Sequence, residues 1–314
     1  MVIQTVSKVY ASYCNEQPPE YYSYEEYEPE IGNIDNYKII KRLGRGKYSE
    51  VFKGICTLTK SLVAIKVLKP VRQKKINREV LVLKQLDHPN IVRMVDVVKD
   101  SDTHTYSIIF EYLEHRETRV LFTELSRKEF AFYAKQVLSA LDYAHSKGIV
   151  HRDIKPHNMI ISKDSKTLKI IDWGLAEFYL PGTAYNVKVA SRFYKGPELL
   201  VDYNYYDYSL DMWSFGCIVA EYFTKKSPFF FGKDNIDQLF VITEVLGRDD
   251  FHAYIKKYQI ALEEDIIVSK NAKRKKFGTE LGECVIDLLD NLLVYDHSER
   301  LSAKECLEHN FFKK

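Results

Sequence analysis

The residues best equipped for chemistry lie between positions 151 and 158, where Asp153, Lys155 and Asn158 occur close together. A second acid, Asp172, follows in the sequence Ile-Ile-Asp-Trp-Gly. A carboxylate can accept a proton from a hydroxyl group, and an ammonium group can hold a phosphate oxygen. An amide oxygen and a second carboxylate can bind a hard cation such as Mg²⁺. Together these groups indicate phosphoryl transfer.

The composition is that of an ordinary globular protein. With 314 residues, 46% of them hydrophobic, the chain can bury a full core in one or two domains. The formal net charge is only +2, so neither nucleic acid nor a membrane is expected as a partner. The five cysteines form no CxxC pair, which argues against a metal site or a disulfide framework. No run approaches the ~20 apolar residues of a membrane span, so we expect a soluble, intracellular protein.

Residues 1–36 are rich in tyrosine and glutamate. This composition fits two interpretations equally well. The segment could be a disordered acidic tail, or it could dock on the rest of the protein, because so many aromatic rings are costly to leave in water.

From Tyr37 onward, short apolar runs predict strands over residues 37–43, 51–55 and 62–68. The first break contains Gly44 and Gly46, which would let backbone N–H groups approach a phosphate closely. Strands rather than a helix flank this loop, which disfavours a Rossmann dinucleotide site. A plain hairpin turn remains the alternative.

Lys66 lies inside the third apolar run, where a lysine usually just points to solvent. The helix predicted over residues 71–86, however, carries Glu79 beside its apolar stripe. A carboxylate next to a core-facing stripe requires a buried cation. We therefore predict that Lys66 and Glu79 form a pair.

The first turns of the same helix are strongly basic. Positive charge at a helix N-terminus is unfavourable by about 0.3–1 kcal/mol per residue. The cluster is either a solvated face or a site for an anionic partner. Its members are Arg72, Lys74, Lys75 and Arg78.

Two further strands, over residues 91–98 and 106–113, precede a helix-rich region. Ser126 and Glu129 predict a capping box, and Gly148 predicts the end of that helix. The predicted fold is α+β and bilobal, with a small antiparallel β-rich lobe that has one main helix, a larger α-helical lobe, and a ligand in the cleft between them.

In this order the motifs resemble the eukaryotic protein kinase family, from about residue 37 to 312. They include the glycine loop, Lys66, Glu79, the segment 151–158, Asp172, Gly196-Pro197-Glu198, Asp211 and Arg300. Trp173 and Gly196, in place of the usual Phe and Ala, resemble the casein kinase II catalytic (alpha) subunit. The resemblance implies an N-terminal segment (1–36) docked on a kinase core, an N-lobe (37–112) and a C-lobe (113–314).

The resemblance also implies roles for individual residues, with ATP or GTP and Mg²⁺ as cofactors. The catalytic residues would be Asp153, Lys155, Lys66 and Glu79, and the metal ligands Asn158 and Asp172. The nucleotide would contact Leu43, Gly44, Arg45, Gly46, Lys47, Ser49, Val51, Ala64, Lys66, Phe110, Glu111, Leu113, Ile160 and Asp172. Asp211 would brace the catalytic loop, and Arg300 would pair with Glu198.

Substrates of this subfamily carry acidic residues after the Ser or Thr, so acidic proteins are the implied partners. The cations expected to bind them are Lys47, Arg72, Lys74, Lys75, Arg78, Lys188, Arg192 and Lys195. A regulatory (beta) subunit in a heterotetramer is a further possible partner. The resemblance implies constitutive activity, with no requirement for phosphorylation at Thr183, Tyr185, Ser191 or Tyr194.

Two points outside the catalytic motifs stay open. The run from Lys273 to Lys276 fits either a nuclear-import signal or a basic surface loop, and we expect the protein in the nucleus and the cytoplasm. The stretch from about 268 to 283 is shorter than in the subfamily.

Two rival functions remain. A pseudokinase scaffold predicts loss of Lys66, Asp153 or Asp172, and all three are present. A cyclin-dependent or proline-directed kinase is disfavoured by Trp173 and Gly196.

Overall fold

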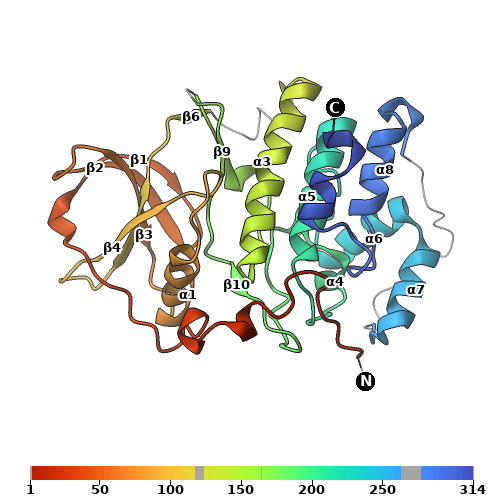
Figure 1. The fold of residues 1–314 in the computed structure, drawn as a ribbon, viewed down its shortest axis with the longest axis horizontal. Coiled ribbons are helices and arrows are strands. Elements are labelled where there is room, and N and C mark those ends of the chain that lie inside the picture. The colour runs from red at the N-terminus through yellow and green to blue at the C-terminus, as the bar shows by residue number, and fades with distance from the viewer. Residues whose placement is uncertain (1, 117–123, 164, 263–276, 314) are drawn as a thin grey trace.

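The computed structural model describes residues 2–116, 124–163, 165–262 and 277–313. Figure 1 shows a twisted sheet with one helix, α1, at one end of the molecule and a group of helices around α3 and α5 at the other. This arrangement is the bilobal α+β fold predicted from the sequence.

The sheet of the smaller lobe has five antiparallel strands in the order β1-β2-β3-β5-β4. Pairing places Lys66 opposite Val51 and Ile108, and Ala64 opposite Phe110. The strands are β1 (Tyr37–Arg45), β2 (Ser49–Cys56), β3 (Leu62–Leu68), β4 (Met94–Lys99) and β5 (Tyr106–Glu111). The helix of this lobe, α1, spans Gln73–Lys84.

Two predicted elements begin later than expected. Helix α1 starts at Gln73 because Arg72 still has extended backbone angles after Pro70. Strand β4 starts at Met94 rather than residue 91. Ile91 instead forms an isolated parallel bridge with Ile170, so the residues before Met94 connect the two lobes.

The larger lobe is mainly helical. Its first long helix, α3, starts with the predicted capping box between Ser126 and Glu129. The helices are α3 (Arg127–Ser146), α4 (Pro197–Leu200), α5 (Ser209–Thr224), α6 (Asn235–Leu246), α7 (Arg248–Tyr258), α8 (Glu283–Leu292) and α9 (Ala303–Leu307). The short strands are β6 (His115–Arg116), β7 (Ile149–Val150), β8 (Met159–Ser162), β9 (Leu168–Ile170) and β10 (Glu177–Phe178). The 3-10 helices of the larger lobe are η4 (Pro156–Asn158), η5 (Arg192–Tyr194), η6 (Thr279–Leu281) and η7 (Asn310–Phe312), and the N-terminal region contains η1 (Cys14–Glu16), η2 (Pro19–Tyr21) and η3 (Ile34–Asn36).

Helix α5 forms the centre of the larger lobe and is buried on nearly every side, as its apolar sequence predicts. The predicted pair between Arg300 and Glu198 is present, with Arg300 Nη1 2.9 Å from Glu198 Oε1 and both side chains fully buried. Arg300 also donates to the backbone oxygen of Ser209, at the start of α5. This pair therefore connects helix α4, which contains Glu198, to the central helix α5.

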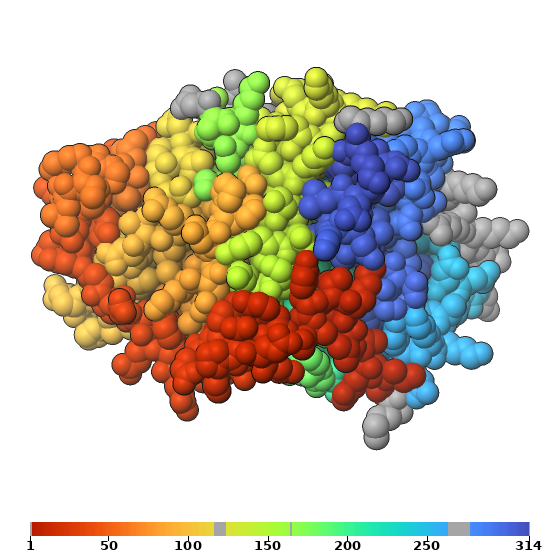
Figure 2. Space-filling view, in the orientation of Figure 1, coloured from red at the N-terminus to blue at the C-terminus, as the bar shows by residue number. Residues whose placement is uncertain are grey.

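Residues 2–36, here called the N-terminal strap, lie along both lobes (Figures 1 and 2). At its start, the N–H of Ile3 donates to Tyr258 O, and Thr5 contacts Tyr203 and His297. At its end, the N–H of Gly32 donates to Val97 O in strand β4. These contacts describe a docked segment rather than a free tail.

The middle of the strap packs closely against Gly148. A Cβ atom at this position would lie 2.3 Å from Cys14 Sγ, and the φ angle of Gly148 is +71°. Only glycine accommodates both the close approach and this backbone conformation. Burial raises the pKa of Cys14 to about 12, and all five cysteines are free thiols.

Among the described residues, no helix is both long and apolar enough to cross a lipid bilayer. The basic run at 273–276 lies outside the described residues, as does much of the stretch from 268 to 283.

Candidate functional site

The loop from His151 to Asn158 connects β7 to β8 and contacts Asp211 of helix α5. The backbone N–H groups of His151 and Arg152 each donate to the Asp211 carboxylate at 2.8 Å. Burial alone would raise the pKa of Asp211, but the hydrogen bonds from the His145 side chain and the His151 backbone, together with the two neighbouring imidazole rings, hold it below its usual value. The ionised carboxylate can therefore accept both N–H groups, which is the bracing predicted for Asp211.

Asp153 lies at the centre of a dense set of donors. Lys155 Nζ is 2.7 Å from its Oδ2, and Asn158 Nδ2 is 3.0 Å from the same oxygen. The backbone N–H and the hydroxyl of Ser191 both donate to Oδ1 at 2.9 Å. These contacts fix the carboxylate in one orientation, as a group that must accept a proton from a hydroxyl requires.

Lys66 joins the two lobes. Its Nζ is 2.6 Å from Glu79 Oε1 and 2.8 Å from Asp172 Oδ1. Burial would lower the pKa of Lys66, but the two carboxylates outweigh it and raise the pKa above its usual value. Lys66 is therefore a permanent cation beside Asp172, and its contact with Glu79 is the pair expected from the sequence.

Asp172 and Asn158 present the oxygen atoms that a hard cation prefers. Burial would raise the pKa of Asp172, but Lys66 lowers it below its usual value, so the group is a carboxylate. Because Asn158 uses its Nδ2 to contact Asp153, its Oδ1 is left as an acceptor. One carboxylate and one amide suit Mg²⁺, which usually keeps several waters and phosphate oxygens. In the part of the chain that the structure describes, no group of three His, Cys, Asp or Glu side chains forms a closed metal site.

Backbone strain occurs at the same place. Asp172 has φ +60° and Arg152 has φ +67°, both in the left-handed region that non-glycine residues rarely adopt. Such conformations persist only where the surroundings enforce them, and they often occur at functional sites.

The predicted nucleotide residues fall into two groups. A cavity of about 910 Å³ between the lobes is lined by Gly46, Lys47, Ser49, Lys66 and Asp172 of this set, together with Asp153 and Lys155. The others lie on β1, β2, β3, β5, β8 and the segment after β5, and they do not line this cavity: Leu43, Gly44, Arg45, Val51, Ala64, Phe110, Glu111, Leu113 and Ile160.

Two details refine the expectations for these residues. The glycine loop is a β1–β2 hairpin in which the N–H of Gly46 donates to Ser49 O at 2.8 Å. The carboxylate of Glu111 is already used by Lys169, at 2.9 Å. The N–H of Glu111 also donates to Arg93 O at 3.0 Å, so both its carboxylate and its N–H already have partners within the chain.

The eight predicted substrate cations differ in availability. Lys74 is paired with Glu25 of the strap at 2.5 Å, and Arg78 with Glu177 at 2.9 Å. Arg192 donates to the backbone oxygens of Gly232 and Lys233. Lys195 is buried, which lowers its pKa. Glu25 and Glu177 of this chain therefore supply part of the negative charge that was expected from a partner at the basic start of α1.

The other four cations are exposed and have no carboxylate partner among the described residues: Lys47, Arg72, Lys75 and Lys188. Lys47 and Lys75 lie 5.2 and 5.4 Å from the ring of Tyr48. Lys47, Lys75 and Lys188 also line the large cavity. They are the cations best placed to meet an acidic ligand.

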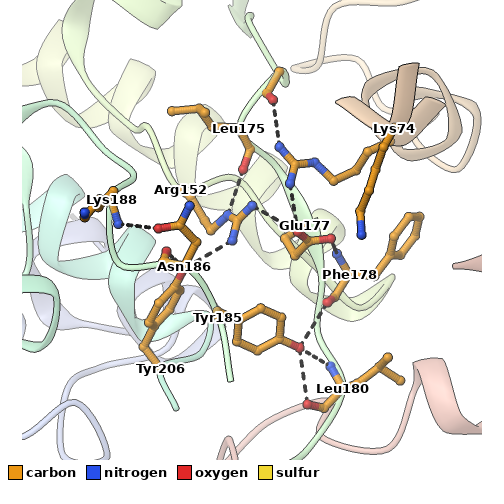
Figure 3. A network of polar contacts seen from close by, with 12 residues as sticks. Lys74, Arg152, Leu175, Glu177, Phe178, Leu180, Tyr185, Asn186, Lys188 and Tyr206 are labelled. Atoms are coloured by element: carbon orange, nitrogen blue, oxygen red, sulfur yellow. Dashed lines mark hydrogen bonds and ion pairs between the residues drawn. The ribbon is translucent and has the colours of Figure 1, made fainter. Parts of the chain in front are cut away.

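Glu177 is a central residue that sequence reasoning missed. Figure 3 shows it facing Arg152, with Arg152 Nη2 3.1 Å from its Oε2. Arg78 Nη1 contacts the same oxygen at 2.9 Å. The sequence indicated Ser191 only as a possible phosphorylation site, not as a neighbour of Asp153. Neither role has a local sequence signal, because the partners lie 25 to 99 positions away.

Comparisons with known proteins agree with this geometry. Residues 37–312 match the family model described as "Protein kinase domain". The chain is also 49% identical over 321 residues to a protein of Encephalitozoon cuniculi (strain GB-M1) named "Probable casein kinase II subunit alpha homolog". That match covers 100% of this chain and 99% of the relative.

Proposed function

Because the chain belongs to the protein kinase family and is a serine/threonine kinase of the casein kinase II alpha type, we propose a specific reaction for it. The γ-phosphate of ATP, or of GTP as a second nucleotide, passes to a Ser or Thr that is followed by acidic residues. The observation that supports this proposal most directly is the convergence of Asp153, Lys155, Lys66 and Asp172 on one cavity rimmed by exposed lysines.

Each group in the cavity has a proposed task. Asp153 accepts or orients the proton of the substrate hydroxyl, and Lys155, 2.7 Å away, faces the moving phosphate. Lys66 holds the α- and β-phosphates while Glu79 keeps it in place. Asp172 and Asn158 would hold Mg²⁺, which supplies positive charge against the phosphates when bound.

We also propose that activity does not depend on phosphorylation. In this chain Glu177 supplies the negative charge next to Arg152 and Arg78 that a phosphate on the same segment could otherwise supply. The hydroxyl of Tyr185 is already used, since it accepts from the N–H of Leu180 at 2.6 Å and donates to Phe178 O at 3.1 Å.

Acidic protein substrates are the proposed partners, and a regulatory beta subunit is a further one. Exposed apolar residues on the edge strand β1, Ile39 (56% exposed) and Ile40 (53%), offer a surface for a subunit. We also propose a nuclear and cytoplasmic location.

The proposed specificity predicts that an acidic serine peptide is phosphorylated at least tenfold more efficiently, in kcat/KM, than a basic serine peptide. The measurement is transfer of labelled phosphate from ATP and then from GTP, with Asp153→Asn as the inactive control. Preference for the basic peptide would refute the specificity while leaving the kinase activity intact.

Charge reversal of the free lysines is expected to act on KM. The double variant Lys75→Glu/Lys188→Glu should raise KM for the acidic peptide roughly five- to tenfold, or about 1–1.4 kcal/mol, with little change in kcat, because charges at the rim act on encounter and binding. The effect should shrink as salt is added. Lys60→Glu, an exposed lysine in the β2–β3 turn outside the cavity, is the matched control. Equal KM values for both variants would exclude Lys75 and Lys188 from substrate binding.

A further inference from the structure

A group of exposed apolar side chains lies outside the catalytic cavity. We call it the α6 patch: the exposed Phe231, Ile236 and Phe240 together with the half-buried Phe193. Phe231 is 65% exposed, Ile236 49% and Phe240 39%. Ile236 and Phe240 are one turn apart on α6 and share a face, whereas Leu239 and Ile242, on the adjoining face, are buried.

The patch is held together by local structure. The rings of Phe193 and Phe231 stack with their centroids 5.3 Å apart. Gly232 packs directly on the backbone of Gln238, and its N–H donates to Gln238 Oε1 at 2.8 Å. These contacts place Phe231 beside the start of α6. Single exposed apolar residues are normal, but a cluster on a rigid helix indicates an interaction site.

The patch continues from the phosphate-acceptor site. Phe193 is two residues after Ser191, whose N–H and hydroxyl contact Asp153. Arg192, between them, donates to the backbone oxygens of Gly232 and Lys233, so it ties the acceptor-site loop to the segment before α6. A polypeptide that lies over Asp153 can therefore pass directly onto the patch.

Charges of both signs flank the patch. Arg192 and Lys233 are both exposed beside it. Two carboxylates lie there as well, since Asp234 accepts from the N–H of Asp237, and Asp237 from the N–H of Lys233. The patch is therefore distinguished by its apolar side chains, and a large apolar side chain on a segment that extends from the acceptor site is complementary to it.

We propose that the α6 patch binds an apolar side chain of the protein substrate, in an acidic segment a few residues away from the phosphorylated Ser or Thr. This inference rests on the proposed function, because it adds a docking determinant to an acid-directed kinase. It explains why the rings of Phe231 and Phe240 remain in water although neither contributes to the buried core.

The test compares peptides of two lengths. The short acidic peptide ends four residues either side of the serine. The long acidic peptides carry a single Phe at successive positions on either side, and their control carries Ser there. With the native chain, Phe at the correct position should lower KM about fivefold without changing kcat. The gain should vanish in Phe231→Ser/Phe240→Ser and persist in Leu58→Ser, which changes a 71% exposed residue of the β2–β3 turn.

The outcomes separate the two proposals. If the short acidic peptide is phosphorylated but no position of Phe lowers KM, or if the double variant keeps the gain, the docking site is refuted and the kinase specificity stands. If acidic peptides are not preferred at all, the proposed function falls, and the docking inference falls with it. Sedimentation velocity tests a second copy as the occupant, and self-association that is lost in the double variant would overturn the substrate assignment.

Discussion

Replacing Lys66 with Met is expected to lower kcat about 10³-fold or more. Lys66 is the only cation among the described residues that contacts both Glu79 and Asp172. Removing one preorganised charge from a catalytic site typically costs 10²–10³ in rate. Here the same change also removes the group proposed to hold the phosphates and the ion pair with Asp172 that joins the two lobes. Labelled phosphate transfer to an acidic peptide under saturating ATP measures the loss.

Stability must be measured in parallel, because Lys66→Met leaves Glu79 buried without its partner. Breaking a buried pair in this way costs about 3–5 kcal/mol, so the melting temperature should fall. Lys66→Arg keeps the positive charge and serves as the conservative control, while Lys66→Met/Glu79→Leu removes both members of the pair and should recover part of the stability but none of the activity. A Lys66→Met variant that retains a tenth of the native kcat would contradict the role proposed for Lys66.

Removing residues 2–30 of the strap is expected to lower activity and the melting temperature together. The strap packs against β10, where Tyr21 meets Phe178 edge-on at 5.6 Å and Tyr24 stacks on it at 6.5 Å. Phe178 follows Glu177, which forms ion pairs with both Arg152 and Arg78. Without the strap, Phe178 loses its packing against Tyr21 and Tyr24. We expect Glu177 then to be less firmly placed, so that it no longer holds Arg152 in one orientation.

The expected size follows from the aromatic contacts. Loss of two half-buried rings, at about half of the ~1.5–3 kcal/mol that full burial contributes, lowers the melting temperature by roughly 3–6 °C in a chain of this size. Differential scanning calorimetry and peptide assays measure both effects. The matched control is Lys8→Ala, which removes only a partly exposed pair with Glu305 and should cost less than about 1 kcal/mol. A truncated chain with native activity and melting temperature would show that the strap has no role in keeping the enzyme active.

The features that could be predicted from the sequence are those with a local or a motif signal. The capping box of Ser126 and Glu129 needs only three residues of separation. The pair Lys66–Glu79 was expected because a carboxylate beside a core-facing stripe requires a buried cation, whereas the pair Arg300–Glu198 was expected only from the kinase resemblance. The lobe order followed from the change of apolar periodicity near residue 113.

Other features depended on long-range packing. Composition left the strap equally open to disorder and docking, and the structure places Tyr21 and Tyr24 on Phe178. Similarly, the sequence indicated that all the basic residues at the start of α1 form a single cluster with one role. The fold instead pairs Lys74 with Glu25 and Arg78 with Glu177, and leaves Lys75 free.

The type of reaction was therefore determined by the sequence alone, because the catalytic groups occur in short segments whose chemistry can be recognised residue by residue. The availability of each charge was decided only by the tertiary structure. An ion pair forms only where two side chains lie close together in space. Glu25 and Lys74 are 49 positions apart in the sequence, and Arg78 and Glu177 are 99 apart, so the sequence does not indicate that they are in contact. The segment from 151 to 158 identifies the chemistry, and the fold around it determines which cations remain for the substrate.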